Sequence, residues 1–290
     1  MVSEDRAWTL VFIAMLGSVF SPRYARARRR HGPQATDPLD FLGLSAVLYG
    51  PGRRRWCLSE RGQSALDRSA AHLRLGPSSL RVEDGSWHAE IQEPGAPFGA
   101  GLSGHLRLDP VLLGSGGRAL SASGLHRWWP MAPMARAEVE LSEPKLRFRG
   151  AAYLDANVGQ EPLEAGFEGW SWARVHGQGA AAIVYEATDR QGQTLLAAER
   201  FGEEGASTPP LSLQRLGRTA WGLEERLRLD QGSTPSGHRR LEDTPFYARS
   251  SLSASILGVR GTAVSESLSL ARFRRREIQA LLGFRARSFR

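Results

Sequence analysis

Residues 136–149 read RAEVELSEPKLRFR, and this stretch predicts the fold more clearly than any other part of the chain. Apolar and charged side chains alternate on both sides of a turn at Ser142-Glu143-Pro144. Such alternation places one set of side chains in a core and the other in water, as in an antiparallel hairpin with one buried face. The stretch therefore predicts two paired β-strands.

The same alternation recurs along the chain, whereas long helical stripes are scarce. Glycine-rich turn signals separate strand-like runs, for example at residues 50–52, 177–179 and 258–261. Short strands at such spacing are typical of β-sandwiches and β-barrels. We therefore predict an all-β fold of antiparallel barrel or sandwich type, with minor helices at residues 60–73 and around Ile278.

The length of 290 residues allows one large domain or two of ordinary size, and two domains fit the pattern better. Residues 162–169 interrupt the strands, and Trp170-Ser171-Trp172 then opens a new series. The predicted domains are residues 1–164, with the candidate catalytic motifs, and residues 165–290. The apolar run at residues 8–20 is shorter than the roughly 20 residues that cross a bilayer, and it predicts a buried strand.

The chain is basic, with 38 Lys and Arg against 30 Asp and Glu, a net charge of +8. All basic residues except Lys145 are arginines, and they cluster at residues 23–30 and 272–290. A GC-rich genome accounts for such a bias as readily as a function does. The functional interpretation is attraction to an anionic membrane surface, where each basic group contributes roughly 1 kcal/mol. Nucleic acid is not predicted as a partner, because no recognisable nucleic-acid-binding motif is present.

Signatures of nucleotide and metal sites are absent from the sequence. We find no GxGxxG after a predicted strand, no P-loop, no HExxH and no GxSxG. The seven histidines show no metal-ligand spacing, and the single cysteine, Cys57, excludes an intramolecular disulfide and a cysteine-rich metal site. We therefore predict neither a cofactor nor a metal.

Two pairs of residues have the types and spacing of a catalytic site. His126 and Trp128 lie two residues apart, as do Tyr153 and Asp155. Residues i and i+2 of a strand point to the same face, so each segment presents a proton-transfer group beside an aromatic ring. The residues taken alone have plainer interpretations: His126 as a structural histidine, and Asp155 as part of a turn in Asp-Ala-Asn-Val-Gly.

The chain contains eight tryptophans, three of which are candidates for substrate binding: Trp129, Trp170 and Trp172. Trp170 and Trp172 share one face of a predicted strand, and large aromatic side chains are suited to lining a pocket for a flat apolar ligand. Tryptophans fill barrel cores just as readily, and Trp129 beside Pro130 has the context of core or interface packing. The sequence leaves these alternatives open.

At this point the chain resembles the carotenoid 1,2-hydratase family, also called hydroxyneurosporene synthases. The matching stretches are GSVFSP (17–22), VLYGP (47–51), SERG (59–62), HRWWP (126–130), GAAYLDANVG (150–159), WSWAR (170–174), LEDTPFYAR (241–249) and ESLSL (266–270). They follow the family's order along nearly the whole chain. The arginine-rich residues 23–30 and Met134 depart from the family pattern, but neither departure touches the candidate site.

The resemblance implies a bacterial enzyme of two lipocalin-like β units, a hydro-lyase of carotenoid biosynthesis. It implies that the enzyme adds water to the terminal C1=C2 double bond of acyclic carotenoids such as neurosporene or lycopene. It also implies that His126, Trp128, Tyr153 and Asp155 form the site. The expected location is cytoplasmic, peripherally on the inner or an intracytoplasmic membrane.

The mechanism predicted for this site begins with Asp155, kept protonated by apolar surroundings, donating its proton to C2. Trp128 and Tyr153 then stabilise positive charge at C1 through their ring faces. His126 orients the acid or accepts a proton from water, although the sequence leaves the division of roles between Asp155 and His126 open.

Two alternatives to hydration remain at this stage: a lipocalin-like carrier that binds carotenoid or lipid without catalysis, and a pericyclase of related fold. Replacement of Asp155 would leave either of these functions intact. The preferred carotenoid, hydration at one or both ends, and the oligomeric state are not determined by the sequence.

Overall fold

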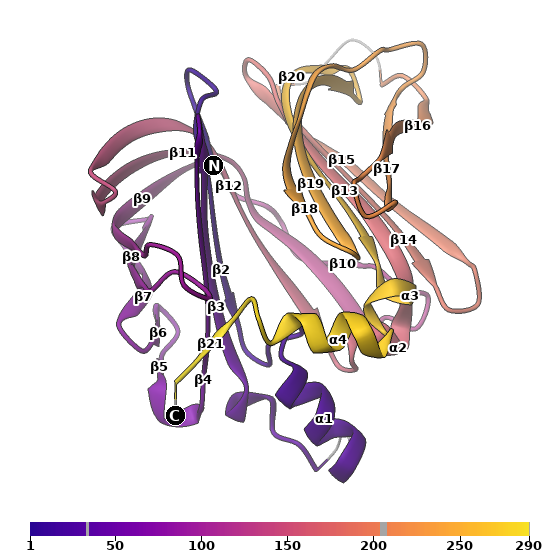
Figure 1. Cartoon of the computed structure of the whole chain (residues 1–290). Coiled ribbons are helices and arrows are strands. Elements are labelled where there is room, and N and C mark those ends of the chain that lie inside the picture. The colour runs from indigo at the N-terminus through magenta and orange to yellow at the C-terminus, as the bar shows by residue number, and fades with distance from the viewer. Residues whose placement is uncertain (33–34, 204–207, 290) are drawn as a thin grey trace. The chain divides into compact units, whose positions relative to one another are not determined.

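A computed structural model describes residues 1–32, 35–203 and 208–289. Strands dominate this part of the chain, and its helices are few and short (Figure 1). The strand pairs are antiparallel, apart from the parallel pairing of β21 (Arg287–Ser288) with β4 (Arg53–Arg61). The predicted all-β class with minor helices is confirmed.

The chain forms two compact units, each built from separate stretches of sequence. Unit 1 comprises Met1–Val111, Ala135–Tyr153 and Gln279–Arg290, and unit 2 comprises Leu112–Met134 and Leu154–Ile278. The boundary predicted between residues 164 and 165 therefore lies inside unit 2. The chain passes between units four times: after Val111, within β11 (His126–Glu143), within β12 (Leu146–Gly159) and after Ile278. In β11 and β12 the strand alternation runs on and marks no boundary.

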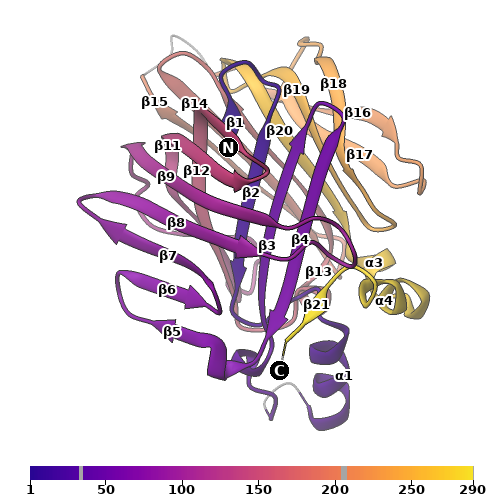
Figure 2. The same ribbon diagram turned by 60° about the vertical axis from the view of Figure 1, so that its left-hand side comes forward.

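Unit 1 is a curled sheet with the strand order β21-β4-β3-β2-β1-β12-β11-β9-β8-β7-β6-β5 (Figure 2). Its further strands are β1 (Val2–Ser3), β2 (Thr9–Met15), β3 (Leu42–Gly50), β5 (Leu66–Arg68), β6 (His72–Leu75), β7 (Ser78–Glu83), β8 (Ser86–Glu93) and β9 (Leu102–Leu112). Its helical elements are α1 (Pro22–His31), η1 (Pro38–Asp40) and η2 (Gln63–Ala65).

The hairpin of β11 and β12 has the predicted wet and buried faces. Val139 and Leu141 are buried in the core of unit 1, whereas Glu138 and Glu140 between them are exposed. Arg147 of β12 pairs with Glu140 on the exposed face. Period-two alternation thus identified the strands and also the face that each residue presents.

The helix predicted over residues 60–73 is wrong. Residues up to Arg61 complete the ladder of β4 against β3, with Leu42 opposite Arg61. The apolar residues that suggested a helix pair across short strands instead, Leu66 with Leu75 and Leu73 with Leu80. Pairing with the next strands along the chain satisfies these backbone groups, and the spacing of apolar residues within the segment does not reveal that pairing.

Two other local predictions are confirmed: a strand lies within residues 8–20, namely β2, and the helix around Ile278 is α4 (Arg276–Leu282). The predicted burial of that strand holds only for Thr9 and Leu10. Helix α1 was not predicted, although the Ser21 hydroxyl accepts a hydrogen bond from the Tyr24 amide and Pro22 occupies the first turn. Within the described ranges, no helix is long and apolar enough to cross a membrane.

Unit 2 is built around a six-stranded sheet with the order β15-β14-β13-β20-β19-β18 and a two-stranded sheet, β16-β17. The strands are β10 (Arg118–Ala119), β13 (Phe167–His176), β14 (Ala180–Asp189), β15 (Thr194–Gly202), β16 (Leu211–Arg218), β17 (Glu224–Asp230), β18 (Ser236–Asp243), β19 (Tyr247–Ile256) and β20 (Val259–Ser269). The short helices α2 (Leu163–Gly166) and α3 (Leu270–Phe273) flank them in sequence.

One face of the six-stranded sheet covers the core of unit 2. Ala173 and Val175 of β13 and Val184 of β14 belong to this core, together with Leu227 and Leu229 of β17. Because successive side chains of a strand alternate between faces, the tryptophans of β13 and the aromatic residue of β14 lie on the opposite face. That opposite face carries the candidate site.

Candidate functional site

The first residues of β11 place the predicted pair on a buried face. His126 is 2% exposed and Trp128 is fully buried. Trp129, on the other face of the strand, is 44% exposed. The alternation arises because successive side chains of a strand point to opposite faces. In this part of β11 the partner strand is β10, where Arg118 lies opposite Trp128. His126 and Trp128 therefore point together into unit 2, and Trp129 points away from them.

A hydrogen bond joins the two motifs that the sequence singled out. The Trp128 indole Nε1 donates to the Asp155 carboxyl Oδ2 at 3.1 Å. An indole N–H can only donate, so the contact fixes one carboxyl oxygen as an acceptor and sets the direction of the carboxyl group. The structure thus brings Trp128 and Asp155 together across β11 and β12.

Five ring-bearing side chains contact one another in series beside this hydrogen bond, and we call them the aromatic cluster: His126, Trp128, Phe167, Trp170 and Tyr185. Their ring centroids lie 4.7 Å apart for His126 and Phe167, 6.1 Å for Phe167 and Trp170, 5.9 Å for Trp170 and Tyr185, and 6.0 Å for Tyr185 and Trp128. These separations are typical of stabilising aromatic pairs. The hydrogen bond between Trp128 and Asp155 therefore lies next to a set of aromatic rings.

His126 fits its position because its neighbours have no side chains. A Cβ atom at Gly159 would lie 2.8 Å from His126 Nδ1, and one at Gly166 would lie 2.8 Å from Nε2. The Nε2 atom lies 3.3 Å from Glu161 Oε1, a contact that becomes an ion pair only when the imidazole is protonated. Burial lowers the pKa of His126, and the opposing attraction of Glu161 is the smaller effect, so neutral imidazole is favoured.

Tyr185 belongs to the site although the sequence analysis did not select it. It is 5% exposed and lies directly opposite Trp172 in the ladder of β13 and β14. Burial raises the pKa of its phenol well above the ordinary value, and the carboxyl groups of Asp155 and Glu266 raise it further whenever they are ionised. Its hydroxyl therefore stays protonated, as a hydrogen-bond donor beside Asp155.

The remaining predicted residues are Trp172, Tyr153 and Trp129. Trp172 shares the face of Trp170, is half-buried, and lies opposite Tyr185 of the aromatic cluster. Tyr153 is half-buried in β12, two residues before Asp155, and is the last residue of its stretch of unit 1. The roles of Tyr153, Trp129 and Trp172 stay predictions.

Glu161, Phe167 and Tyr185 are the site residues that sequence reasoning missed. A tyrosine inside the buried run AAAIVYEA is the only signal for Tyr185, and a buried strand offers many such residues. Phe167 is held by Arg274, whose Nη1 donates to the Phe167 carbonyl oxygen at 3.3 Å and to that of Glu164 at 3.2 Å. This link spans more than a hundred residues, so local pattern does not reveal it.

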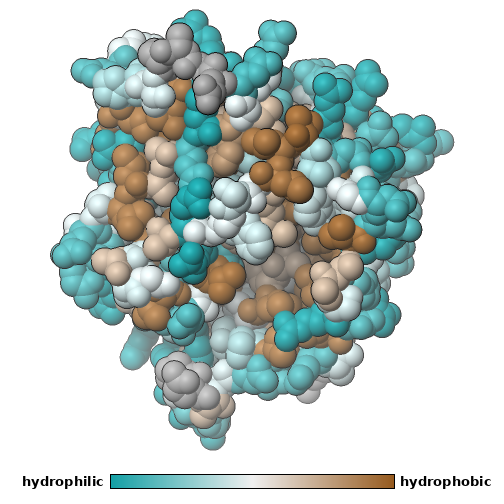
Figure 3. Space-filling model, turned by 180° about the vertical axis from the view of Figure 1, so that it is seen from behind, coloured by the Kyte–Doolittle hydropathy of each residue, from teal (hydrophilic) through white to brown (hydrophobic). Residues whose placement is uncertain are grey.

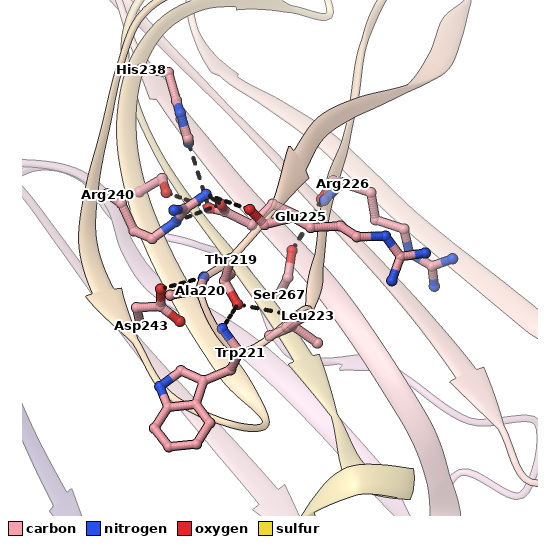
Figure 4. A network of polar contacts seen from close by, with 12 residues as sticks. Thr219, Ala220, Trp221, Leu223, Glu225, Arg226, His238, Arg240, Asp243 and Ser267 are labelled. Atoms are coloured by element: carbon pink, nitrogen blue, oxygen red, sulfur yellow. Dashed lines mark hydrogen bonds and ion pairs between the residues drawn. The ribbon is translucent and has the colours of Figure 1, made fainter.

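Other polar and hollow regions do not include the predicted residues. Two pockets lie in unit 1, one beside Arg61 and Phe289 and one beside Glu93 and Arg287. A buried polar network in unit 2 centres on Glu225 (Figure 4). Among residues 1–32, 35–203 and 208–289, no group of three or more His, Cys, Asp or Glu side chains is arranged to hold a metal ion.

Comparison with known proteins identifies relatives along the whole length of the chain. A family model described as carotenoid hydratase CrtC matches residues 12–288. The acyclic carotenoid 1,2-hydratase of Thiocapsa roseopersicina is 39% identical over 287 residues, which cover 98% of this chain and 70% of the relative. The protein of that name from Rubrivivax gelatinosus is 37% identical over 291 residues, with the same shares of each chain.

Among solved structures, a putative AttH from Nitrosomonas europaea aligns with a TM-score of 0.58 at 12% sequence identity. The alignment covers 92% of this chain and 88% of that chain. At this identity the likeness shows the fold alone, and the fold is the predicted lipocalin-like one.

Proposed function

This chain belongs to the carotenoid hydratase family, and on that basis we propose that it adds water to the terminal C1=C2 double bond of an acyclic carotenoid such as neurosporene or lycopene. The named relatives are hydro-lyases, and the chain is an enzyme of this class. Hydration gives a 1-hydroxy carotenoid. Water is the cosubstrate and the overall oxidation state does not change, so the proposal includes no cofactor.

The observation that carries the proposal is the hydrogen bond from Trp128 to Asp155 beside the ring of Tyr185. Protonation of an alkene needs a strong acid, and apolar surroundings favour the neutral, proton-bearing form of a carboxyl group. With Oδ2 held as an acceptor by Trp128, the other carboxyl oxygen carries the proton. Asp155 then donates this proton to C2.

The positive charge that forms at C1 requires protection until water arrives. Ring faces of the aromatic cluster stabilise such a charge by about 0.5–2 kcal/mol per contact. Trp128, Trp170 and Tyr185 supply these faces near Asp155, and we assign Tyr153 the same role. His126 is kept neutral by burial and orients the site or accepts a proton.

We further assign substrate delivery to a peripheral contact with an anionic membrane. The carotenoid is comparable in length to the roughly 30 Å hydrocarbon core, so one end enters the protein while the rest stays in the lipid. Helix α1 carries no acidic residue in its first turn and exposes Arg23, Arg26, Arg29 and Arg30. Its exposed arginines match the negative surface of a membrane facing the cytoplasm.

Exposed hydrophobic side chains are also available for contact with lipid. Phe98 is 93% exposed, Phe284 70% and Leu113 62%. Figure 3 shows hydrophobic residues among hydrophilic ones on the face opposite to the view of Figure 1. Exposed apolar side chains and exposed basic side chains are both features of proteins that rest on a membrane.

The proposed reaction is tested by producing wild type, Asp155→Asn and Asp189→Asn in a host that makes lycopene. Asp189 is a matched control because its carboxylate accepts hydrogen bonds from the backbone amides of Gln191 and Gln193 in a turn. The side-chain oxygen of an asparagine accepts the same hydrogen bonds. We expect hydroxylated lycopene from wild type and Asp189→Asn and none from Asp155→Asn. Pigments are separated by chromatography and identified by mass.

Unchanged lycopene in the wild-type host overturns the proposal. If the purified wild type then binds lycopene tightly and Asp155→Asn binds it equally well, the protein is a carrier. A cyclised product that survives Asp155→Asn identifies a pericyclase instead.

A further inference from the structure

Two sequence stretches outside the site described above meet on the same sheet of unit 2. Arg249 of β19 lies directly opposite Glu266 of β20. Its Nε donates to Glu266 Oε1 at 2.9 Å, and its Nη2 lies 2.8 Å from the same oxygen. Both contacts use Oε1, so the carboxylate keeps a second oxygen, Oε2, with its own lone pairs.

The register of the sheet places Glu266 on the face of the aromatic cluster. Glu266 lies opposite Trp172 of β13, and Trp172 lies opposite Tyr185 of β14. Residues directly opposite each other in antiparallel strands point to one face, and neighbouring strands are about 4.8 Å apart. Tyr185, Trp172, Glu266 and Arg249 therefore form one row on the face turned away from the core of unit 2.

Burial and charge distinguish Glu266 from a purely structural carboxylate. Its side chain is 23% exposed, whereas that of Arg249 is 7% exposed, so the arginine is enclosed while water reaches the carboxylate. The pKa of Tyr185 is raised first by burial and then by both Asp155 and Glu266. Two carboxyl groups, from β12 and β20, thus act on the same buried phenol.

Resting on the proposed hydratase function, we propose that Glu266 is a second catalytic carboxylate, which orients the attacking water and takes its proton. Arg249 is the positioning residue that holds Oε1 and leaves Oε2 for the water. Because Glu266 accepts the proton in this proposal, His126 has the other of its two possible roles, which is to orient the site.

The proton and electron balance of the step is as follows. The π electrons of C1=C2 form a C2–H bond with the proton of Asp155, leaving a carboxylate there and a cation at C1. A lone pair of water forms the C1–O bond, and the resulting oxonium loses a proton to Glu266. A protonated alcohol is a strong acid, so a carboxylate paired with arginine is basic enough. Solvent then returns the proton from Glu266 to Asp155.

The test separates protonation of the alkene from capture of water. Purified wild type, Glu266→Gln and Glu186→Gln are incubated with lycopene in lipid vesicles prepared in D₂O, and product and recovered lycopene are analysed by mass. Glu186 is a matched control: it is buried, 4% exposed, and paired with Arg228, but it lies one residue after Tyr185 and so points to the core face.

For Glu266→Gln we expect hydration to fall by roughly 10²-fold, the scale of a lost general base. Asp155 still protonates C2, so the cation returns to alkene and the recovered lycopene carries more deuterium per product formed than with wild type. Glu186→Gln should keep the wild-type ratio. A structural role for Glu266 would change both rates together and leave this ratio unaltered.

The proposal is overturned if folded Glu266→Gln hydrates at the wild-type rate, or loses hydration without any rise in the deuterium ratio. If circular dichroism shows that Glu266→Gln is unfolded, Glu266→Asp carries the same test, with a smaller rise expected from its withdrawn carboxylate. A wild type that forms neither product nor deuterated lycopene refutes the hydratase function itself, which is a distinct outcome.

Discussion

At the scale of single residues, the glycines around His126 allow its burial, and burial determines its protonation state. The imidazole fits against Gly159 and Gly166, because a Cβ atom at either of these two positions would clash with it. Removal from water then lowers the pKa of His126, and the nearby Glu161 compensates only in part. The neutral ring that results is the form able to accept a proton, which links local sequence directly to chemistry.

This state predicts a pH dependence of stability. His126 in the unfolded chain has a pKa near 6.5, and in the folded protein its pKa is lower. As pH falls below 6.5, the unfolded state therefore binds the proton first, and the free energy of unfolding decreases until the folded pKa is passed. We expect wild type to lose more stability between pH 8 and pH 5 than His126→Asn does.

Urea unfolding at a series of pH values measures this difference. The control is His105→Asn, which removes an exposed histidine of unit 1 and should retain the wild-type loss on acidification. Parallel profiles for wild type and His126→Asn would contradict the expectation.

At the scale of elements, an ion pair between buried Glu225 and exposed Arg240 connects the two sheets of unit 2. Glu225 of β17 accepts hydrogen bonds from Arg240 Nε of β18 at 2.8 Å and from Ser250 Oγ of β19 at 2.5 Å (Figure 4). His238 Nε2 lies 3.5 Å from the same carboxylate, whose side chain is 3% exposed. The network supports the six-stranded sheet from the face opposite the aromatic cluster.

We expect Glu225→Gln to lower the free energy of unfolding by roughly 1.5–3 kcal/mol, because it removes charge-assisted hydrogen bonds from Arg240 and Ser250 to an enclosed carboxylate. The matched control is Glu140→Gln, whose exposed pair with Arg147 should contribute about 0–1 kcal/mol. Denaturant unfolding of both variants gives the comparison. Equal losses would show that the network of Figure 4 contributes no more than a surface pair.

At the scale of the whole molecule, the two arginine clusters have different uses. Arg272 donates to the carbonyl oxygens of Trp221 and Gly222, and Arg274 binds those of Glu164 and Phe167. Arg285 stacks on Trp56. These C-terminal arginines hold the fold together, whereas Arg290 lies outside the described residues. Arg275 and Arg276 of the C-terminal cluster are exposed, as are four arginines of the N-terminal cluster on α1.

The membrane proposal accordingly predicts that four arginines of α1 dominate binding to anionic vesicles. Replacing Arg23, Arg26, Arg29 and Arg30 with Gln should weaken binding by about 10²-fold or more, since each basic group contributes ~1 kcal/mol near the surface. Added salt should weaken wild-type binding as well. Vesicle sedimentation measures both effects.

The control variant removes the same charge from elsewhere in unit 1, by replacing Arg68, Arg74, Arg81 and Arg107 with Gln, all of them exposed. An equal loss of binding in this variant would assign the attraction to net charge alone. Binding that is insensitive to salt would contradict the electrostatic proposal altogether.

The sequence by itself determined the features that depend on near neighbours along the chain. Alternation in residues 136–149 was sufficient for the hairpin of β11 and β12, and spacing by two was sufficient to place His126 and Trp128 on one buried face. These predictions hold because the faces of a strand repeat every second residue, whatever the strand pairs with. The motifs shared with the carotenoid hydratases supplied the reaction class.

Only the tertiary structure decided what depends on strand register and distant pairing. It replaced the helix predicted over residues 60–73 by short strands, and it divided the chain into units within β11 and β12. It placed Tyr185 opposite Trp172, and Glu266 on the other side of the same tryptophan. Register is set by hydrogen bonds between segments far apart in sequence, and a shift of one residue would turn each of these side chains to the other face.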